Sequence, residues 1–172
     1  NALERQGLQG AELKWPNDIV YNYQKLGGIL INVVASEETL TTVVVGVGIN
    51  LSLPLVQLAS IGQPATDLKH IAKDLRLNQD IDANAIYGAI LDELTTTFYL
   101  YDAHGFQDMQ QRWEALHAYQ GKLIRLVQDD QIVEGKVVGI TPEGAIRIHN
   151  GHDENSYIIG DVSLQAQPQP HT

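Results

Sequence analysis

The fold is decided by residues 14–50, which read KWPNDIVYNYQKLGGILINVVASEETLTTVVVGVGIN. Three apolar runs rich in Ile and Val predict β-strands, namely Asp18–Tyr21, Gly28–Val34 and Thr41–Ile49. The turn-like Asn22-Tyr23-Gln24 and the polar break Ser36-Glu37-Glu38 separate these runs, as the loops of β-hairpins do. Because the runs are almost continuously apolar, we expect a sheet that is buried on at least one face.

Helical spacing replaces the strand pattern after an expected loop from Leu53 to Pro64. Thr66 can cap a helix whose apolar positions are Leu68, Ile71, Ala72 and Leu75. A longer helix follows and ends at Gly105; its apolar residues are Ile86, Ile90, Leu91, Leu94 and Phe98. A short helix with Phe106, Met109, Trp113 and Leu116 on one side is expected next.

After Gly121 the apolar period becomes two, and about five short strands are expected in some fifty residues. The turn Thr141–Gly144 and the hairpin signal Asn150-Gly151 separate some of them. We therefore predict an α+β chain in which a mixed sheet with helices precedes a small SH3-like β-barrel. The expected divisions are residues 1–118 for the first domain, 119–165 for the barrel and 166–172 for a flexible tail.

Composition excludes several classes of function. The chain has 21 acidic and 11 basic residues, and its net charge of −10 opposes nucleic-acid binding by this segment, which would need a basic surface. Cysteine is absent from the sequence, so disulfides, thiolate nucleophiles and cysteine-bound metals are excluded. Since no apolar stretch approaches the roughly 18 residues of a membrane helix, we expect no membrane association and a cytoplasmic location.

The first of three motifs is Lys14-Trp15-Pro16-Asn17-Asp18. Pro16 pushes Trp15 into an extended conformation, so the side chains of Asn17 and Asp18 can reach outward where a strand turns. A turn stabilised by Asn or Asp, closing a hairpin, is the alternative interpretation. Taken alone, the motif favours this turn, because short motifs often match by chance. The clustering of Lys14 and Trp15 at the same corner weakens that interpretation, since a turn alone does not require it.

The second motif is Lys25-Leu26-Gly27-Gly28-Ile29. Its two glycines let the main chain approach a ligand without an intervening side chain. The lysine ammonium can neutralise charge that develops on a carboxylate or phosphate oxygen. A glycine bulge at the start of a strand, with a solvated lysine, explains the same residues equally well.

The third motif is Gly46-Val47-Gly48-Ile49-Asn50. Gly46 and Gly48 share one face of a strand, so a flat ring or a ribose could lie on that bare face, with Asn50 at its edge. Close packing of a helix on the bare face is the alternative. The sequence lacks the third glycine of a dinucleotide fingerprint and the Gly-Lys-Ser/Thr of a P-loop. The histidines have no metal-ligand spacing, and we predict no metal ligands.

Together and in this order, the three motifs resemble the signature of the bacterial biotin protein ligases, the biotin–[acetyl-CoA-carboxylase] ligases. The likeness is strongest over Glu12–Asn50, and Gly135–Leu164 looks like the C-terminal domain of that family. The resemblance implies a sheet akin to class II aminoacyl-tRNA synthetases, followed by an SH3-like domain. It also implies an enzyme that makes biotinyl-5′-AMP from biotin and MgATP. The biotin would then pass to a lysine of a biotin carboxyl carrier protein.

The resemblance assigns roles to residues of all three motifs. Lys25 would be the catalytic residue, because it would contact the carboxylate of biotin and later the adenylate. The residues implied in biotin binding are Lys25, Gly27, Gly28, Gly46 and Gly48. Those implied in nucleotide binding are Lys14, Asn17, Asp18, Ile49 and Asn50. Mg²⁺ is implied only as the partner of the ATP phosphates.

The chain also departs from the family pattern. In the family a loop rich in glycine and arginine precedes the first motif, whereas Arg5 is the only arginine before Lys14 here. The segment from Leu51 to Thr66 has no aromatic residue that could stack on adenine. Since the first residue is Asn1 rather than Met, we expect an N-terminally truncated fragment that is poorly active alone. A truncated sheet would leave apolar surface uncovered, so we also expect self-association.

Two other functions fit the same residues. A lipoate-type acyl-adenylating ligase would share the sheet and the lysine, although the first motif and the C-terminal barrel fit biotin ligases better. A non-catalytic protein-interaction module would use the barrel to dock a partner, and its glycines would serve packing alone.

Overall fold

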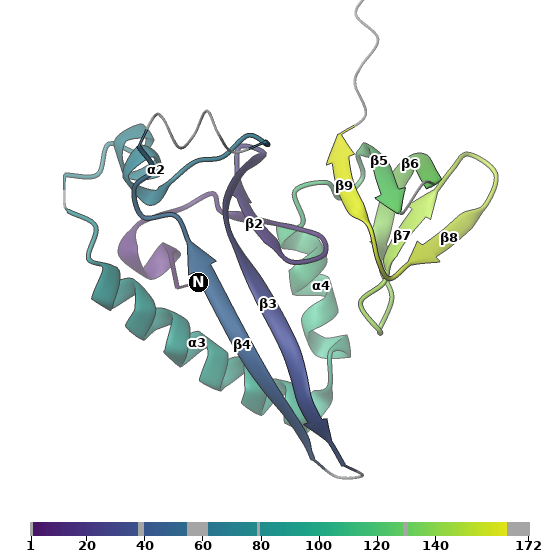
Figure 1. Ribbon diagram of the computed structural model, residues 1–172, viewed down its shortest axis with the longest axis horizontal. Helices are drawn as coiled ribbons and strands as arrows, with labels where there is room; N and C mark the ends of the chain where they lie inside the picture. The colour runs from purple at the N-terminus through teal and green to yellow at the C-terminus, as the bar shows by residue number, and fades with distance from the viewer. Residues whose placement is uncertain (1, 38–39, 55–61, 79, 129–130, 165–172) are drawn as a thin grey trace, which may run out of the picture. The chain divides into compact units, whose positions relative to one another are not determined.

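The computed structural model describes residues 2–37, 40–54, 62–78, 80–128 and 131–164. It divides the chain into two compact units. The first comprises Asn1–Leu13 and Asn17–Asp102, and the second comprises Lys14–Pro16 and Ala103–Thr172. The two units carry one antiparallel sheet each, and helices accompany both, so the α+β prediction is confirmed (Figure 1).

The sheet of the first unit has the strand order β1-β2-β3-β4. Its strands are β1 (Glu12–Lys14), β2 (Asp18–Tyr21), β3 (Gln24–Ser36) and β4 (Thr41–Ile49). The bounds predicted for β2 and β4 are confirmed, whereas β3 begins earlier than expected, because a two-residue turn at Asn22 and Tyr23 already reverses the chain. Both turn residues have positive φ, as the tight hairpin turns that match strand twist require. Glu38 lies outside the described residues.

The helices are η1 (Glu4–Gln6), α2 (Leu68–Asp74), α3 (Ala83–His104) and α4 (Gln107–Leu116). The prediction that Thr66 caps α2 is wrong, because the cap is Asp67, whose Oδ1 accepts the His70 N–H at 2.7 Å. Thr66 lies one residue too early for that bond and is itself buried. Gly105 follows α3 with φ 68°, so the predicted end of that helix is confirmed. None of the described helices is long and apolar enough to cross a membrane.

One apolar cluster forms the core of the first unit, and it consists of Leu8, Tyr21, Leu26, Leu68, Ile71, Ala72 and Ile86. It joins the β2–β3 hairpin to α2 and to the start of α3. The predicted apolar face of α2 is confirmed, since Leu68, Ile71 and Ala72 are all buried. Of the described α3 residues, only Ile86 and Ala89 are buried.

The sheet of the second unit has the order β8-β7-β6-β5-β9. Its strands are β5 (Leu123–Gln128), β6 (Gln131–Ile140), β7 (Ile146–His149), β8 (Glu154–Tyr157) and β9 (Asp161–Leu164). The expected alternation is confirmed on β5, where Ile124 and Leu126 are buried between exposed neighbours. Helix α4 is fixed to this sheet, because the Ile140 N–H donates to Glu114 and the Ile140 carbonyl accepts from Gln110.

Candidate active site

A β-bulge brings Lys25 onto the same face of the first sheet as Asp18. Across the β2–β3 hairpin, Asp18 pairs with Gly28 and Val20 pairs with Lys25, and the register shifts between Ile19 and Val20. Asp18 and Val20 share a face of β2. Their partners Lys25 and Gly28 therefore share that face too, although they are three residues apart. The bulge thus re-aims the lysine, as bulges beside active sites do.

The side chains of Lys25 and Asp18 form an ion pair on this face. The Lys25 Nζ lies 2.7 Å from Oδ1 of Asp18, a distance typical of a charge-assisted hydrogen bond. The side chain of Asp18 is 12% exposed and that of Lys25 is 34% exposed. The carboxylate is therefore nearly enclosed, while the ammonium keeps one side open to a ligand. A lysine that is merely solvated, as the alternative interpretation of the second motif required, does not describe this geometry.

The main chain of Lys25 is held from the opposite side by the segment before α2. The Lys25 N–H donates to the Pro64 carbonyl at 2.9 Å, and the Thr66 N–H donates to the Lys25 carbonyl at 2.9 Å. These bonds form an isolated parallel bridge between Lys25 and Ala65. The sequence did not predict this contact, because Pro64 is typical of a loop and Thr66 was interpreted as a helix cap.

Glycines from two strands leave the same face bare. Gly28 pairs with Gly48, and Gly46 lies two residues further along β4, so these three glycines share the face of Asp18 and Lys25. A Cβ built at Gly48 would meet no atom within 4 Å, and one at Gly46 would make only ordinary contact with the Leu30 carbonyl. The predicted bare face is therefore present, and it is open rather than covered by a helix within the described residues.

Gly27 has a different function from the other glycines. It pairs with Ile49 on β4, and a Cβ added at Gly27 would overlap the main-chain carbonyl oxygen of Gly48. Gly27 is thus required for the close approach of β3 and β4. Ile49 is half-buried against the apolar core of the first unit. Both residues lie on the opposite face from the ion pair, where they support the strand that carries Gly48.

The two asparagines of the motifs lie in contrasting positions. The Asn50 side-chain amide donates to the carbonyls of Lys25 and Thr66, at 3.3 and 3.0 Å, and so joins β3 to the segment before α2. Asn17 is exposed, and its carbonyl accepts the Ile29 N–H at 2.8 Å. Asn50 therefore positions the backbone of Lys25, while the Asn17 side chain lies at the surface.

Lys14 belongs to the second unit. Its Nζ lies 3.0 Å from Oδ1 of Asp161 at the start of β9, and its side chain is mostly buried. The structure thus brings together Asp18, Lys25 and the three face-sharing glycines, but it gives Lys14 a partner in the C-terminal sheet. The role of Lys14 in nucleotide binding stays a prediction.

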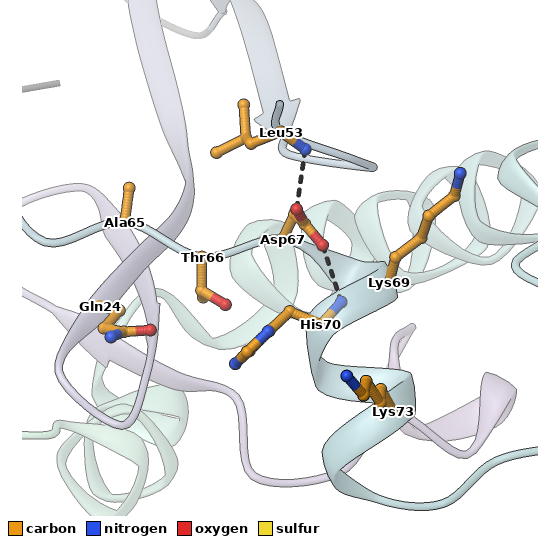
Figure 2. A pocket seen from close by; sticks show the side chains of 8 residues that line it. All are labelled: Gln24, Leu53, Ala65, Thr66, Asp67, Lys69, His70 and Lys73. Carbon is orange, nitrogen blue, oxygen red and sulfur yellow. Dashed lines mark hydrogen bonds between the residues drawn. The ribbon is translucent and has the colours of Figure 1, made fainter. Parts of the chain in front are cut away.

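A shallow hollow lies beside this site, on the side of α2 (Figure 2). Its lining residues are Gln24, Leu53, Ala65, Thr66, Asp67, Lys69, His70 and Lys73. Asp67 shapes it by accepting the N–H groups of Leu53 and His70, each at 2.7 Å. None of the residues predicted from the motifs lines this hollow, although Gln24 and Ala65 adjoin Lys25 along the chain and across the bridge. Among the described residues, no three His, Asp or Glu side chains are grouped to hold a metal ion.

Comparison with known proteins gives two matches to family models. The Biotin/lipoate A/B protein ligase family matches residues 1–50, which contain all three motifs, and the Biotin protein ligase C terminal domain matches residues 120–165. The first match, which contains the site, places this part of the chain in the biotin/lipoate class of protein ligase families. With the second match, which is specific to biotin ligases, the chain belongs to the biotin protein ligase family.

Individual relatives agree with this assignment. The chain is 25% identical over 164 residues to the bifunctional ligase/repressor BirA of Escherichia coli (strain K12), covering 95% of this chain and 49% of that protein. It is 29% identical over 166 residues to the protein of the same name from Bacillus subtilis (strain 168), covering 94% and 48%. The chain therefore spans about half the length of the curated relatives it matches.

Solved structures show the fold. The biotin protein ligase from Aquifex aeolicus in complex with biotin and ATP is similar with a TM-score of 0.75 and 24% sequence identity. The similarity covers 96% of this chain and 66% of that one. The apo structure of the same ligase gives a TM-score of 0.76. These structures thus confirm the predicted fold, including the SH3-like C-terminal part, while the family assignment rests on the two family models.

Proposed function

We propose that the protein containing this chain is an ATP-dependent biotin–protein ligase. It forms biotinyl-5′-AMP from biotin and MgATP with release of pyrophosphate, and it transfers the biotin to a lysine of a biotin carboxyl carrier protein with release of AMP. The observation that carries the proposal is the Lys25–Asp18 ion pair, which lies on the same face as the bare strand positions Gly28 and Gly48. The relatives named ligase and the ligase complex with biotin and ATP support it.

Lys25 acts electrostatically in this proposal. Attack of the biotin carboxylate on the α-phosphate brings two anionic groups together, and the open side of the Lys25 ammonium offsets their repulsion and the charge that develops. Asp18 keeps the lysine side chain in one orientation, because its nearly enclosed carboxylate holds Nζ at 2.7 Å. The same ammonium stabilises the phosphate as leaving group when the carrier lysine attacks the adenylate carbonyl. Mg²⁺ enters as the partner of the ATP phosphates.

The glycines give the ligand its place. Biotin or the adenylate lies along the face where Gly28, Gly46 and Gly48 leave no side chain, so an apolar ring system contacts the strands directly. Asn17 and Asp18 lie at the start of β2, on the nucleotide side of this surface. Asn50, Ile49 and Gly27 contribute indirectly, since they fix the strands that carry Lys25 and Gly48.

We further propose that the 172-residue chain alone catalyses this reaction slowly. Arg5, the only arginine before the first motif, is engaged with Asp92 and Glu93 of α3 at 3.5 and 2.7 Å and so does not face the Lys25 site. No aromatic residue from Leu51 to Thr66 can cover adenine. Among the described residues, the substrates therefore meet mainly Lys25, Asp18 and the glycine face.

Self-association is proposed for the same chain. The end of the β3–β4 hairpin farthest from Lys25 exposes large apolar side chains, including Ile31, Val33 and Val44. An exposed, long apolar strand pair of this kind is a template for pairing with another copy. The net charge of −10 opposes nucleic acid as the occupant of this surface.

Lipoate is the second candidate acid. The family model matched by residues 1–50 includes lipoate ligases, so this part of the chain does not distinguish the two acids. The match of residues 120–165 to the biotin ligase C-terminal domain favours biotin.

The test is ATP–pyrophosphate exchange by the full-length gene product, with biotin or lipoate as the acid and the 172-residue chain assayed alongside. Exchange with biotin alone supports the proposal, and an inactive 172-residue chain supports the incomplete site. Exchange with lipoate alone would identify lipoate, and not biotin, as the acid substrate. No exchange with either acid from a folded protein would favour the non-catalytic interaction module.

A further inference from the structure

A buried histidine lies beside the first motif, outside the site described above. His117 directly follows α4 and is only 4% exposed. Its ring lies 4.8 Å from that of Trp113, between ring centroids, and 6.1 Å from that of Tyr119 in an edge-on arrangement. Sequence spacing did not predict a partner for this histidine. Its hydrogen-bond partner is Trp15, which lies far away in the sequence.

His117 and the C-terminal sheet hold the first motif by separate bonds. The Trp15 main-chain N–H points to Nε2 of His117 at 3.4 Å, and the Trp15 indole N–H donates to the Gly144 carbonyl at 2.9 Å. Lys14 adds its ion pair with Asp161. Residues Lys14–Pro16 are therefore anchored within the second unit, while the chain re-enters the first unit at Asn17. The next residue is Asp18, the ion-pair partner of Lys25.

The hydrogen bond to Trp15 requires a neutral imidazole, because a protonated Nε2 cannot accept. Burial lowers the pKa of His117 to about 4, and the Gln120 side chain and the charge of Glu114 oppose this shift. Glu114, on α4, is the acidic group that faces the ring, and its Oε1 is engaged by the Ile140 N–H. The ring also contacts the Gln120 side chain and the aromatic rings of Trp113 and Tyr119. His117 is therefore an acceptor throughout the neutral pH range, with its proton on Nδ1.

We propose that His117 is a positioning residue of the ligase, whose neutral ring fixes the main chain of Trp15 and so sets where Asn17 and Asp18 enter β2. We call the bond between His117 Nε2 and the Trp15 N–H the clamp. The clamp is present in the chain whatever its activity, and only its effect on catalysis rests on the proposed function. The partner of His117 is the backbone, so the proposal requires an acceptor at the position of Nε2, not a charge.

The tautomer of the ring is the first test. Imidazole ¹⁵N shifts of the 172-residue chain are measured by NMR from pH 7.5 to 3.5, together with tryptophan emission. We expect His117 to be neutral with the proton on Nδ1 at pH 7 and to titrate near pH 4. Emission should change in the same interval, since both tryptophans of the chain adjoin the ring. A ring that carries its proton on Nε2 at pH 7, or that titrates near 6.5, would overturn the proposal.

Substitution is the second test, with the amide signals of Asn17, Asp18 and Lys25 as the readout. His117→Phe keeps a ring but removes the acceptor, so these signals should move. His117→Gln offers an acceptor oxygen and should return them toward their original positions. His152→Phe changes an exposed histidine and should leave them in place. A folded His117→Phe chain with unmoved signals contradicts the clamp. If that variant does not fold, the tautomer measurement on the unaltered chain tests the clamp in its place.

Catalysis is measured separately in the full-length gene product. His117→Phe should lower biotin-dependent exchange about 10- to 100-fold, the scale of a small displacement of catalytic groups, and His117→Gln should restore part of it. Equal exchange rates in all variants, with displaced amide signals, would retain the clamp but refute its part in catalysis. If no variant exchanges, including the unaltered protein, the proposed function fails while the NMR result stands on its own.

Discussion

The two ends of the β3–β4 hairpin have similar apolar sequences but very different surroundings. At one end, Lys25–Gly28 and Gly48–Asn50 are tied to β2 and to the segment before α2 by main-chain and side-chain hydrogen bonds. At the other end, Ile31 is 59% exposed and Val33 is 64% exposed, although both belong to the same strand. The ion pair of Lys25 and Asp18 and the amide of Asn50 lie at the tied end. Fixing the backbone there lets bare glycines and one lysine act together, whereas the far end exposes large apolar side chains.

The largest expected effect is on the packing of the tied end, where Gly27→Ala is compared with Gly48→Ala. The added methyl at Gly27 overlaps the Gly48 carbonyl oxygen, so the free energy of unfolding should fall by about 3 kcal/mol, a typical cost of overpacking backbone. At Gly48 the methyl enters open space, so stability should stay within about 0.5 kcal/mol.

Chemical denaturation of the 172-residue chain measures both values, and exchange by the full-length gene product adds the functional contrast. Gly48→Ala should keep the fold but weaken biotin-dependent exchange, because its methyl lies on the face assigned to the ligand. Equal exchange rates for Gly48→Ala and the unaltered protein would argue against a ligand on this face.

The second prediction removes the Lys25 cation from the tied face. Lys25→Ala should lower biotin-dependent exchange by about 100-fold or more, as loss of a preorganised charge does at other sites of charge development. Lys73→Ala on α2 is the matched control, since it removes an exposed lysine at the neighbouring hollow. Similar losses from the two substitutions would show a general effect of positive charge. Unchanged exchange in Lys25→Ala would remove Lys25 from the mechanism.

Much of this contrast between the two ends was predictable from sequence. The bounds of β2 and β4, the shared face of Gly46 and Gly48, and the number of strands in the C-terminal sheet follow from local periodicity. The strand expected at Tyr157–Ile159 was misplaced, because β8 is formed by the polar residues Glu154–Tyr157 that pair with β7. The bulge that turns Lys25 toward Asp18 did not follow, because a register shift is set by the pairing of two strands and not by either alone. The bridge at Ala65 and the His117–Trp15 contact are likewise tertiary, and their residues carry no local pattern.

Asn50 tests whether the tied end owes its stability to side-chain amides. Asn50→Ala removes the two bonds from its amide to the Lys25 and Thr66 carbonyls, so the free energy of unfolding should fall by about 1 to 2 kcal/mol. Exchange should fall as well, since the Lys25 backbone loses a support. Asn17→Ala is the control, because the exposed Asn17 contributes its main-chain carbonyl rather than its side chain to the sheet. Asn17→Ala is a control for stability alone, and loss of exchange in this variant at unchanged stability would support the proposed place of Asn17 on the nucleotide side.

The smallest effect on stability is expected at the far end, where Ile31→Lys with Val33→Lys places two charges on one face of β3. Both side chains are more than half exposed, so the free energy of unfolding should change by no more than about 0.5 kcal/mol. The variant should need a higher protein concentration to self-associate, as measured by sedimentation velocity, because charged side chains discourage strand pairing. Val34→Lys, at the bulge next to Val33, shows whether one face or the whole strand is involved. An unaltered chain that stays monomeric at high concentration would refute the proposed association, and the exposed end would then serve no contact between copies.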